Sequence, residues 1–112
     1  MIESKSEIRD GMQIDWDVPI EMDDGVVVRA DIFRSLEDSK YPAILSYGPY
    51  GKWFHFSDYF VDQWTRMCDE HPDVPGGSTN KYQSFEVADP EKFVPDGYAV
   101  VRVDSRGTGR SP

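Results

Sequence analysis

Residues 46–52, SYGPYGK, lead out of an apolar run and carry Tyr50 between Pro49 and Gly51, inside a turn-forming sequence. The glycines and the proline around Tyr50 favour a tight turn, so the side chain is expected where a strand ends. A phenol in such a place can donate a hydrogen bond to a reacting oxygen, or it can pack as an ordinary half-buried aromatic. We expect the neighbouring Lys52 to be a solvated or ion-paired flank of the turn and not a catalytic group.

A second candidate site is the glycine turn of residues 104–112, DSRGTGRSP. A dinucleotide fingerprint would need glycine where Pro112 stands, and no GK[ST] sequence occurs, so a nucleotide ligand has little support. Asp104 is either a catalytic carboxylate or a residue that holds its loop. In the second case it would accept backbone N–H bonds or pair with Arg106 or Arg110. Loop holding is the better interpretation, because aspartates at strand ends more often have that role.

The sequence contains no complete pattern of metal ligands. Cys68 and His71 have C-x-x-H spacing, but no second pair completes a zinc site, and His55 stands apart from them. The aspartates of residues 15–24 do not match a calcium loop, since Pro19 occupies the third ligand position. We therefore predict neither a metal nor an organic cofactor.

A serine nucleophile is also not recognisable. Neither Gly76-Gly77-Ser78 nor Gly109-Arg110-Ser111 satisfies the G-x-S-x-G pattern of a nucleophile elbow. The residues alone therefore indicate no Ser/His/Asp constellation in this chain.

The elements that must position these residues begin with strands. Alternating apolar residues, Ile14, Trp16, Val18 and Ile20, predict one buried face, and the whole of residues 14–34 reads as an antiparallel hairpin about an Asp-Gly turn. The short apolar runs at residues 43–47 and 98–103 are typical of strands covered on both faces. Because a long segment with helical character separates these two runs, they predict a parallel pair with a crossover, hence an α/β fold.

The crossover is expected to hold one clear helix at residues 58–70, capped by Ser57 and stopped at His71-Pro72. Asp89-Pro90 starts a second helix of a turn or two. These helices are too few to cover both faces of a sheet, and no helix follows the last glycine turn. We interpret residues 1–112 as one piece of a larger domain, with no domain boundary inside it.

Composition limits the partners. The formal net charge of −9 argues against nucleic acid and against an anionic membrane surface, since both are bound through Lys and Arg. No apolar run approaches the roughly 20 residues that span a bilayer. The single cysteine and the polar start, which lacks the apolar core of a secretion signal, favour a reducing, cytoplasmic setting.

Three segments together resemble a known family. VPIEMDDGVVVRADIFR, YPAILSYGPYGK and FVPDGYAVVRVDSRGTGRSP resemble, in order and spacing, the opening segments of the cocaine esterase and X-Pro dipeptidyl-peptidase (CocE/NonD-type) group of α/β-hydrolases. The resemblance covers residues 14–52 and 89–112, and Val28 replaces the usual leucine of the family. Residues 53–88 are longer and more aromatic than the family minimum.

The resemblance implies the amino-terminal part of an α/β-hydrolase sheet in a serine hydrolase, with Ser, Asp and His of the triad beyond Pro112. It implies a small-molecule acyl ester or amide substrate, including aminoacyl or X-Pro types, and an acyl-serine intermediate. Tyr50 matches the family tyrosine that donates its hydroxyl to the oxyanion hole. The partner would be the remainder of the hydrolase chain or a second chain.

Two alternatives stay open. The chain could instead be a noncatalytic binding or structural module that keeps hydrolase-like strands. The aromatic residues after the turn could form an apolar wall over the site or pack the crossover helix, and packing is the better interpretation. These residues are Trp53, Phe54, Phe56, Tyr59 and Trp64.

Overall fold

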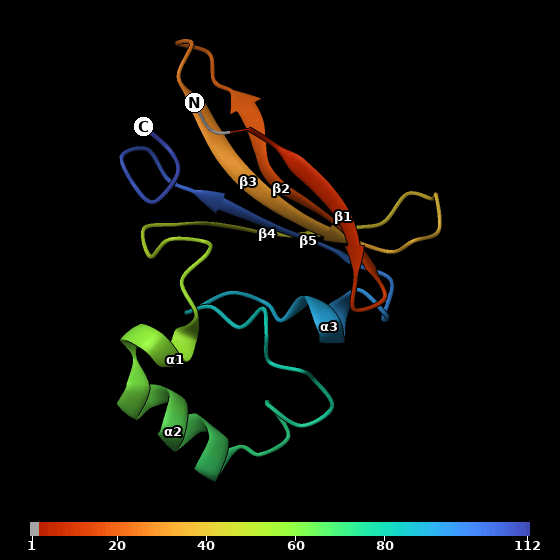
Figure 1. Cartoon of the computed structure of the whole chain (residues 1–112), viewed down its shortest axis with the longest axis vertical. Helices are drawn as coiled ribbons and strands as arrows, with labels where there is room; N and C mark the ends of the chain where they lie inside the picture. The colour runs from red at the N-terminus through yellow and green to blue at the C-terminus, as the bar shows by residue number, and fades with distance from the viewer. Residues whose placement is uncertain (1–2) are drawn as a thin grey trace.

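The computed structural model describes residues 3–112, which form a five-stranded mixed sheet and three short helices (Figure 1). The strands are β1 (Lys5–Arg9), β2 (Met12–Glu21), β3 (Val27–Arg34), β4 (Ala43–Gly48) and β5 (Ala99–Asp104). The helices are α1 (Phe56–Tyr59), α2 (Val61–Glu70) and α3 (Pro90–Phe93). None of the helices in residues 3–112 is long and apolar enough to cross a membrane.

The predicted hairpin is confirmed as β2 and β3, which pair antiparallel. Its turn is closed by a bond from the Met22 amide to the Val26 carbonyl, and Asp24 accepts the Val26 amide. The sequence did not predict β1, which pairs antiparallel with β2 across the Asp10-Gly11 turn. Its residues KSEIR hold one apolar side chain, and this side chain is exposed, so hydrophobic alternation could not find the strand.

A β-bulge at Asp17 changes which residues of β2 face inward. Asp17 has φ 54°, and the register with β3 shifts between Asp15 and Val18. Ile14 therefore lies opposite Phe33 on one face of the sheet, whereas Ile20 lies opposite Val28, which belongs to the core on the other face. The prediction of one common face for Ile14, Trp16, Val18 and Ile20 is wrong, because the extra residue of a bulge interrupts the two-residue period.

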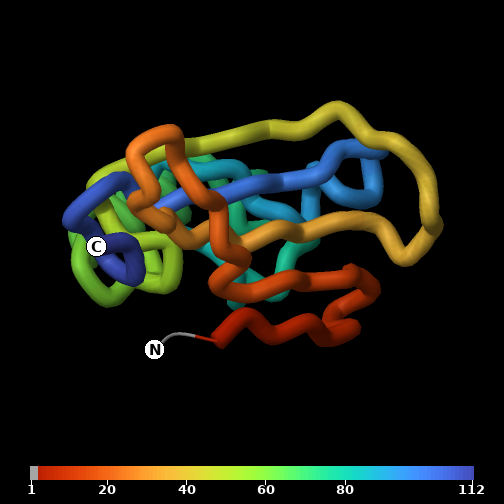
Figure 2. The backbone as a smooth tube through the Cα atoms, turned by 90° about the horizontal axis from the view of Figure 1, so that it is seen from above, coloured from red at the N-terminus to blue at the C-terminus, as the bar shows by residue number. Residues whose placement is uncertain are grey.

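The parallel pair with a crossover is confirmed. β4 and β5 pair parallel, and β5 is inserted between β3 and β4 in the order β1-β2-β3-β5-β4. Figure 2 shows the strands side by side from β4 to β1, with the crossover between β4 and β5 on one side of them. On that side, the main core joins β2, β3 and β5 to the crossover; its members are Met12, Ile14, Phe33, Tyr82, Val94 and Val100.

The expectation that both runs are covered on both faces is wrong for β4. Leu45 and Tyr47 are 63% and 51% exposed, on the face opposite the crossover. The reason is that β4 lies at the sheet edge and the crossover covers one face only (Figure 2). β5, in the sheet interior, has most of its residues buried.

The crossover helix begins differently from the prediction. The expected helix at residues 58–70 is divided into α1 and α2 at Phe60, whose φ of −124° and ψ of 58° are not helical. His55, not Ser57, caps the first helix: its Nδ1 accepts the Ser57 amide at 3.1 Å. The end at His71 is confirmed, and so is the short helix α3, whose cap Asp89 accepts the Glu91 amide.

Candidate functional site

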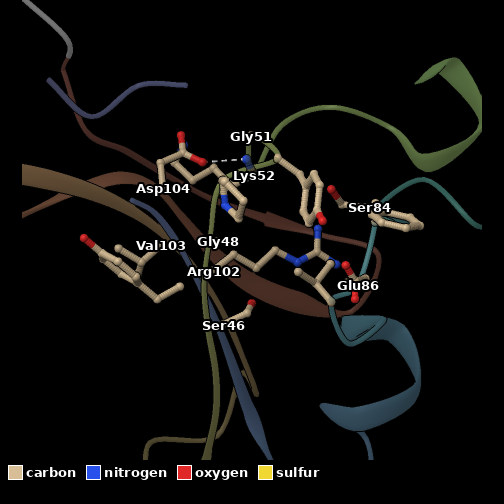
Figure 3. A pocket seen from close by; sticks show the side chains of 14 residues that line it. Ser46, Gly48, Gly51, Lys52, Ser84, Glu86, Arg102, Val103 and Asp104 are labelled. Atoms are coloured by element: carbon tan, nitrogen blue, oxygen red, sulfur yellow. Dashed lines mark hydrogen bonds between the residues drawn. The ribbon is translucent and has the colours of Figure 1, made fainter. Parts of the chain in front are cut away.

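A cavity of about 220 Å³ lies where β4 and β5 end. Its walls are the turn after β4, the end of β5 and the segment of residues 84–87. Figure 3 shows Lys52 and Asp104 at one side of this cavity, and Arg102 reaching from β5 toward Glu86 and Ser84 at the other. The predicted candidate Tyr50 and the predicted loop residue Asp104 thus lie in one site.

The turn that carries Tyr50 is fixed at both ends. The Gly48 carbonyl accepts the Ser105 amide at 3.1 Å, and the Lys52 amide donates to Asp104 Oδ1 at 2.6 Å. Gly51 has φ 86°, and a Cβ there would lie 2.7 Å from the Phe54 ring, so only glycine fits.

Asp104 holds its loop through backbone N–H groups, as the preferred interpretation predicted. Besides the Lys52 amide, it accepts the Arg110 amide at 2.8 Å, and its side chain is buried. A Cβ at Gly109 would collide with the carboxylate. Neither arginine side chain pairs with Asp104: Arg106 pairs with Asp24 at 2.6 Å, and the Arg110 guanidinium lies 3.7 Å from Asp17. Because the carboxylate occupies loop amides that a phosphate would need, a dinucleotide at this turn finds no support here.

Lys52 is ion-paired, as predicted, but it is not solvated. Its side chain is 3% exposed, and Nζ lies 2.5 Å from Asp17 Oδ1 and 3.0 Å from Asp31 Oδ1. Asp31 is 1% exposed; its burial raises the pKa of this carboxyl, opposed by the Asp17 amide and the Lys52 ammonium. The cluster Lys52, Asp17 and Asp31 lies directly behind the turn.

Tyr50 is 43% exposed and borders the cavity. Its ring packs edge-to-face on Phe85 at 5.0 Å and on Phe60 at 6.1 Å, so the crossover limits its orientation. A hydrogen bond with the Glu86 carboxylate, together with the charge of that carboxylate, raises the pKa of the Tyr50 phenol above its ordinary value.

Arg102 ties the far wall of the cavity to the sheet. Its Nη2 donates to the carbonyls of Tyr82 and Ala88, at 2.5 and 2.8 Å, and its guanidinium lies over the Phe33 ring. Burial lowers the pKa of Arg102 to about 10, opposed by the charges of Asp31 and Asp89. The arginine stays charged at neutral pH and fixes both ends of the segment that presents Phe85 and Glu86.

A second cavity of about 210 Å³ adjoins the first and shares Tyr50 with it. Of the five aromatic residues considered as a wall, Phe54, Phe56 and Tyr59 line it; Trp53 and Trp64 do not. The alternative was that these aromatic residues pack the crossover helix. They give it no fully buried residue, since none is buried in α1 or α2 of the described chain. Phe60 and Phe85 stack at 4.0 Å at its border.

The histidines and the cysteine lie apart from the first cavity. His55 contacts Ser57 Oγ at 2.8 Å and the Asn80 carbonyl at 2.5 Å, which ties α1 to the loop at residue 80. His71 ends α2, and Cys68 is half-buried within it. Within residues 3–112, no three His, Cys, Asp or Glu side chains are grouped as metal ligands would be.

Comparison with known proteins identifies the family. The model of the X-Pro dipeptidyl-peptidase (S15) family matches residues 24–112. The chain belongs to this family. Two solved structures of a CocE/NonD family hydrolase from Staphylococcus aureus are similar to it, at 31% and 30% identity with TM-scores of 0.68 and 0.67. No curated protein matches the sequence.

The S15 match confirms the resemblance seen in the sequence, and it also includes residues 53–88, which that resemblance did not cover. Each Staphylococcus aureus structure matches over 89% of this chain, but the chain spans only 16% of that hydrolase, in its N-terminal portion. The five-stranded mixed sheet is therefore the fold of an N-terminal portion of a CocE/NonD hydrolase.

Three residues of this candidate site were not predicted by the sequence analysis: Asp17, Asp31 and Glu86. Asp31 carried a usable signal, since a charge inside the apolar strand VVRADIFR requires a buried partner. Asp17 and Glu86 carried none, because both have left-handed backbones, with φ 54° and 59°, that no local pattern predicts.

Proposed function

We propose that this chain forms the first strands of a serine hydrolase of the α/β-hydrolase fold and supplies Tyr50 to its oxyanion hole. The substrate would be an acyl ester or amide, X-Pro and aminoacyl types included. The observation that carries the proposal is the turn of Tyr50: it leaves the carboxyl end of β4 in a chain of the S15 family and borders a cavity there.

The position agrees with the chemistry of this fold. In α/β-hydrolases the second oxyanion donor comes from the loop between the third strand and the first helix. Tyr50 lies in the first strand-to-helix loop of this sheet, between β4 and α1. A serine held by the rest of the hydrolase would attack the acyl carbonyl and give its proton to a histidine, while the carbonyl oxygen gains negative charge. The Tyr50 hydroxyl would donate to that oxygen.

The electrostatic state of Tyr50 suits a donor. An oxyanion donor must keep its proton, and the Glu86 carboxylate raises the pKa of Tyr50 further above neutrality. Because the phenol has one proton, its hydrogen bond would turn from Glu86 to the substrate oxygen during the reaction. The edge-to-face contacts with Phe60 and Phe85 hold the ring before the reaction, so little reorganisation is needed when charge develops.

The remaining expectations belong to the same proposal. The catalytic serine, acid and base would come from the remainder of the hydrolase or from a partner chain, and no metal or organic cofactor would be required. The single Cys68 supports a reducing, cytoplasmic setting.

The test starts with the intact protein as purified. Its mass under denaturing conditions is compared with 12.8 kDa, and it is treated with a fluorophosphonate that labels activated serines. Hydrolysis of p-nitrophenyl acetate and of an Xaa-Pro p-nitroanilide is then measured for Tyr50→Phe. Tyr98→Phe, at the opposite end of β5, is the matched control.

Loss of an oxyanion donor lowers kcat by about two to three orders of magnitude, so Tyr50→Phe should do so and Tyr98→Phe should not. Retention of most of the rate by Tyr50→Phe would contradict the role of Tyr50. A folded, inert species of 12.8 kDa without fluorophosphonate labelling would instead favour the noncatalytic binding module.

A further inference from the structure

The Tyr50 turn is a three-residue bridge between two fixed points. Upstream, the Gly48 carbonyl is bonded to the Ser105 amide, and downstream, the Lys52 amide is bonded to Asp104. Only Pro49, Tyr50 and Gly51 lie between these anchors. The place of the Tyr50 hydroxyl therefore depends on how firmly Gly48 and Lys52 are held.

The downstream anchor has a second attachment. The Lys52 ammonium contacts Asp17 on β2 and Asp31 on β3, at 2.5 and 3.0 Å. Its side chain is 3% exposed, and that of Asp31 is 1% exposed. A nearly buried ammonium with two carboxylate partners at short distances has little freedom to move, so Lys52 is attached to two strands of the sheet.

The local structure of β2 is shaped to make this contact. The bulge at Asp17 puts this residue in the left-handed region, which aspartate tolerates better than most side chains. The Asp17 amide then donates to Asp31 Oδ1 at 3.0 Å, and the Arg29 guanidinium donates to the Asp17 carbonyl at 3.1 Å. Bulges commonly re-aim a side chain next to an active site, and here the bulged residue directs its carboxylate to Lys52.

We propose that Lys52 and Asp17 are positioning residues for Tyr50: their ion pair, completed by Asp31, holds the turn so that the tyrosine hydroxyl meets the developing oxyanion. This inference rests on the proposed function, since it names the residues that orient the Tyr50 hydroxyl as oxyanion donor. Lys52 borders the cavity but its ammonium is held by the two carboxylates, and Asp17 does not line the cavity. Ion pairing of this kind gives little net stability, because desolvation offsets the attraction, so its value here is the geometry it imposes.

The test is a double-mutant cycle in the intact enzyme. Asp17→Asn is introduced with Tyr50 present and again in the Tyr50→Phe background, and kcat and KM are measured with p-nitrophenyl acetate. Asparagine tolerates the left-handed backbone, and the Lys52 and Asp31 pair remains, so no buried charge is left alone. Asp15→Asn is the matched control: the same change, on the same strand, at a residue that pairs with the exposed Arg34.

With Tyr50 present, Asp17→Asn should lower kcat about tenfold with KM little changed, since misplacement by about 1 Å can cost about 10²-fold. In the Tyr50→Phe background the same change should alter kcat less than about twofold, because there is no hydroxyl left to misplace. Asp15→Asn should leave kcat unchanged in both backgrounds.

Equal losses in both backgrounds, or no loss in a folded Asp17→Asn enzyme, would overturn the positioning role while leaving Tyr50 as donor. Failure of the proposed function is distinguishable, since then Tyr50→Phe alone keeps its rate. If Asp17→Asn unfolds, the charge-balanced pair Lys52→Met with Asp31→Asn is put through the same cycle. Its loss of kcat must again depend on the Tyr50 hydroxyl, and a loss independent of it refutes the proposal.

Discussion

Replacing Asp104 by asparagine should loosen both loops at the end of the parallel strands. The carboxylate is 1% exposed and accepts two backbone amides, one from each loop, at 2.6 and 2.8 Å. Asparagine keeps one acceptor oxygen and turns an NH₂ donor toward the other amide, so one buried N–H loses its partner. Hydrogen bonds to charged groups contribute about 1.5–3 kcal/mol each, and an unsatisfied buried group adds to the loss. We expect about 2–4 kcal/mol less stability.

The assay is equilibrium urea unfolding of the intact protein, followed by tryptophan fluorescence. With a slope of about 1–3 kcal/mol per molar urea, the expected change moves the midpoint by about 1–2 M. Asp38→Asn, at an exposed position, is the control and should leave the midpoint in place. A change for Asp104→Asn within about 0.5 kcal/mol, the range of ordinary surface substitutions, would refute the assignment of this carboxylate as the link between the loops.

Three further outcomes are expected. Arg102→Met should lower stability by about 2–4 kcal/mol and increase proteolysis of residues 82–88, because the carbonyls of Tyr82 and Ala88 lose their charged donor. Phe85→Ala should lower the kcat/KM preference for p-nitrophenyl benzoate over acetate by about tenfold, since the 210 Å³ cavity loses a wall; an unchanged ratio would exclude that cavity as a binding site for the acyl group. The ion pair with Arg106 lowers the pKa of Asp24 from 3.8 to about 2, mainly through their hydrogen bond. Because the pKa of Asp24 is lower in the folded protein, the ion pair stabilises the fold above pH 3.8, and this stabilisation is lost as pH falls through about 2. When unfolding is measured against pH, this acid-induced loss of stability should be absent in Asp24→Asn.

The strands that carry the site could be predicted because their signals are local. Two short apolar runs with a long helical segment between them gave the parallel pair, and alternation about an Asp-Gly turn gave the hairpin. The turn residues around Tyr50 likewise placed it correctly at the end of β4. Among the described residues, the one strand that the sequence did not predict is β1, because its pairing depends on its neighbour β2 and not on its own composition.

The charge cluster behind the turn shows where sequence reasoning stops. Lys52, Asp17 and Asp31 are separated by 35 and 21 positions along the chain, and only the register of β2 and β3 brings the two carboxylates together. That register itself depends on the bulge, since an unbroken two-residue period gives no reason for Asp17 to turn inward. Without the strand register, Lys52 of the PYGK sequence is therefore predicted to be a surface residue.

The bulge also connects the fold to the proposed chemistry. A left-handed aspartate is less favourable than an extended one, and such strain persists only where the surroundings fix it. Here four contacts fix Asp17: Lys52 and Arg110 on its carboxylate, Arg29 on its carbonyl and Asp31 on its amide. Of these partners, Lys52 directly follows the turn that carries Tyr50, whereas the exposed side of the same hairpin has ordinary surface ion pairs, such as that of Arg34 with Asp15. A left-handed residue inside β2, bound to the lysine that follows the Tyr50 turn, is the pattern expected if the aim of that side chain matters more than the stability of the strand.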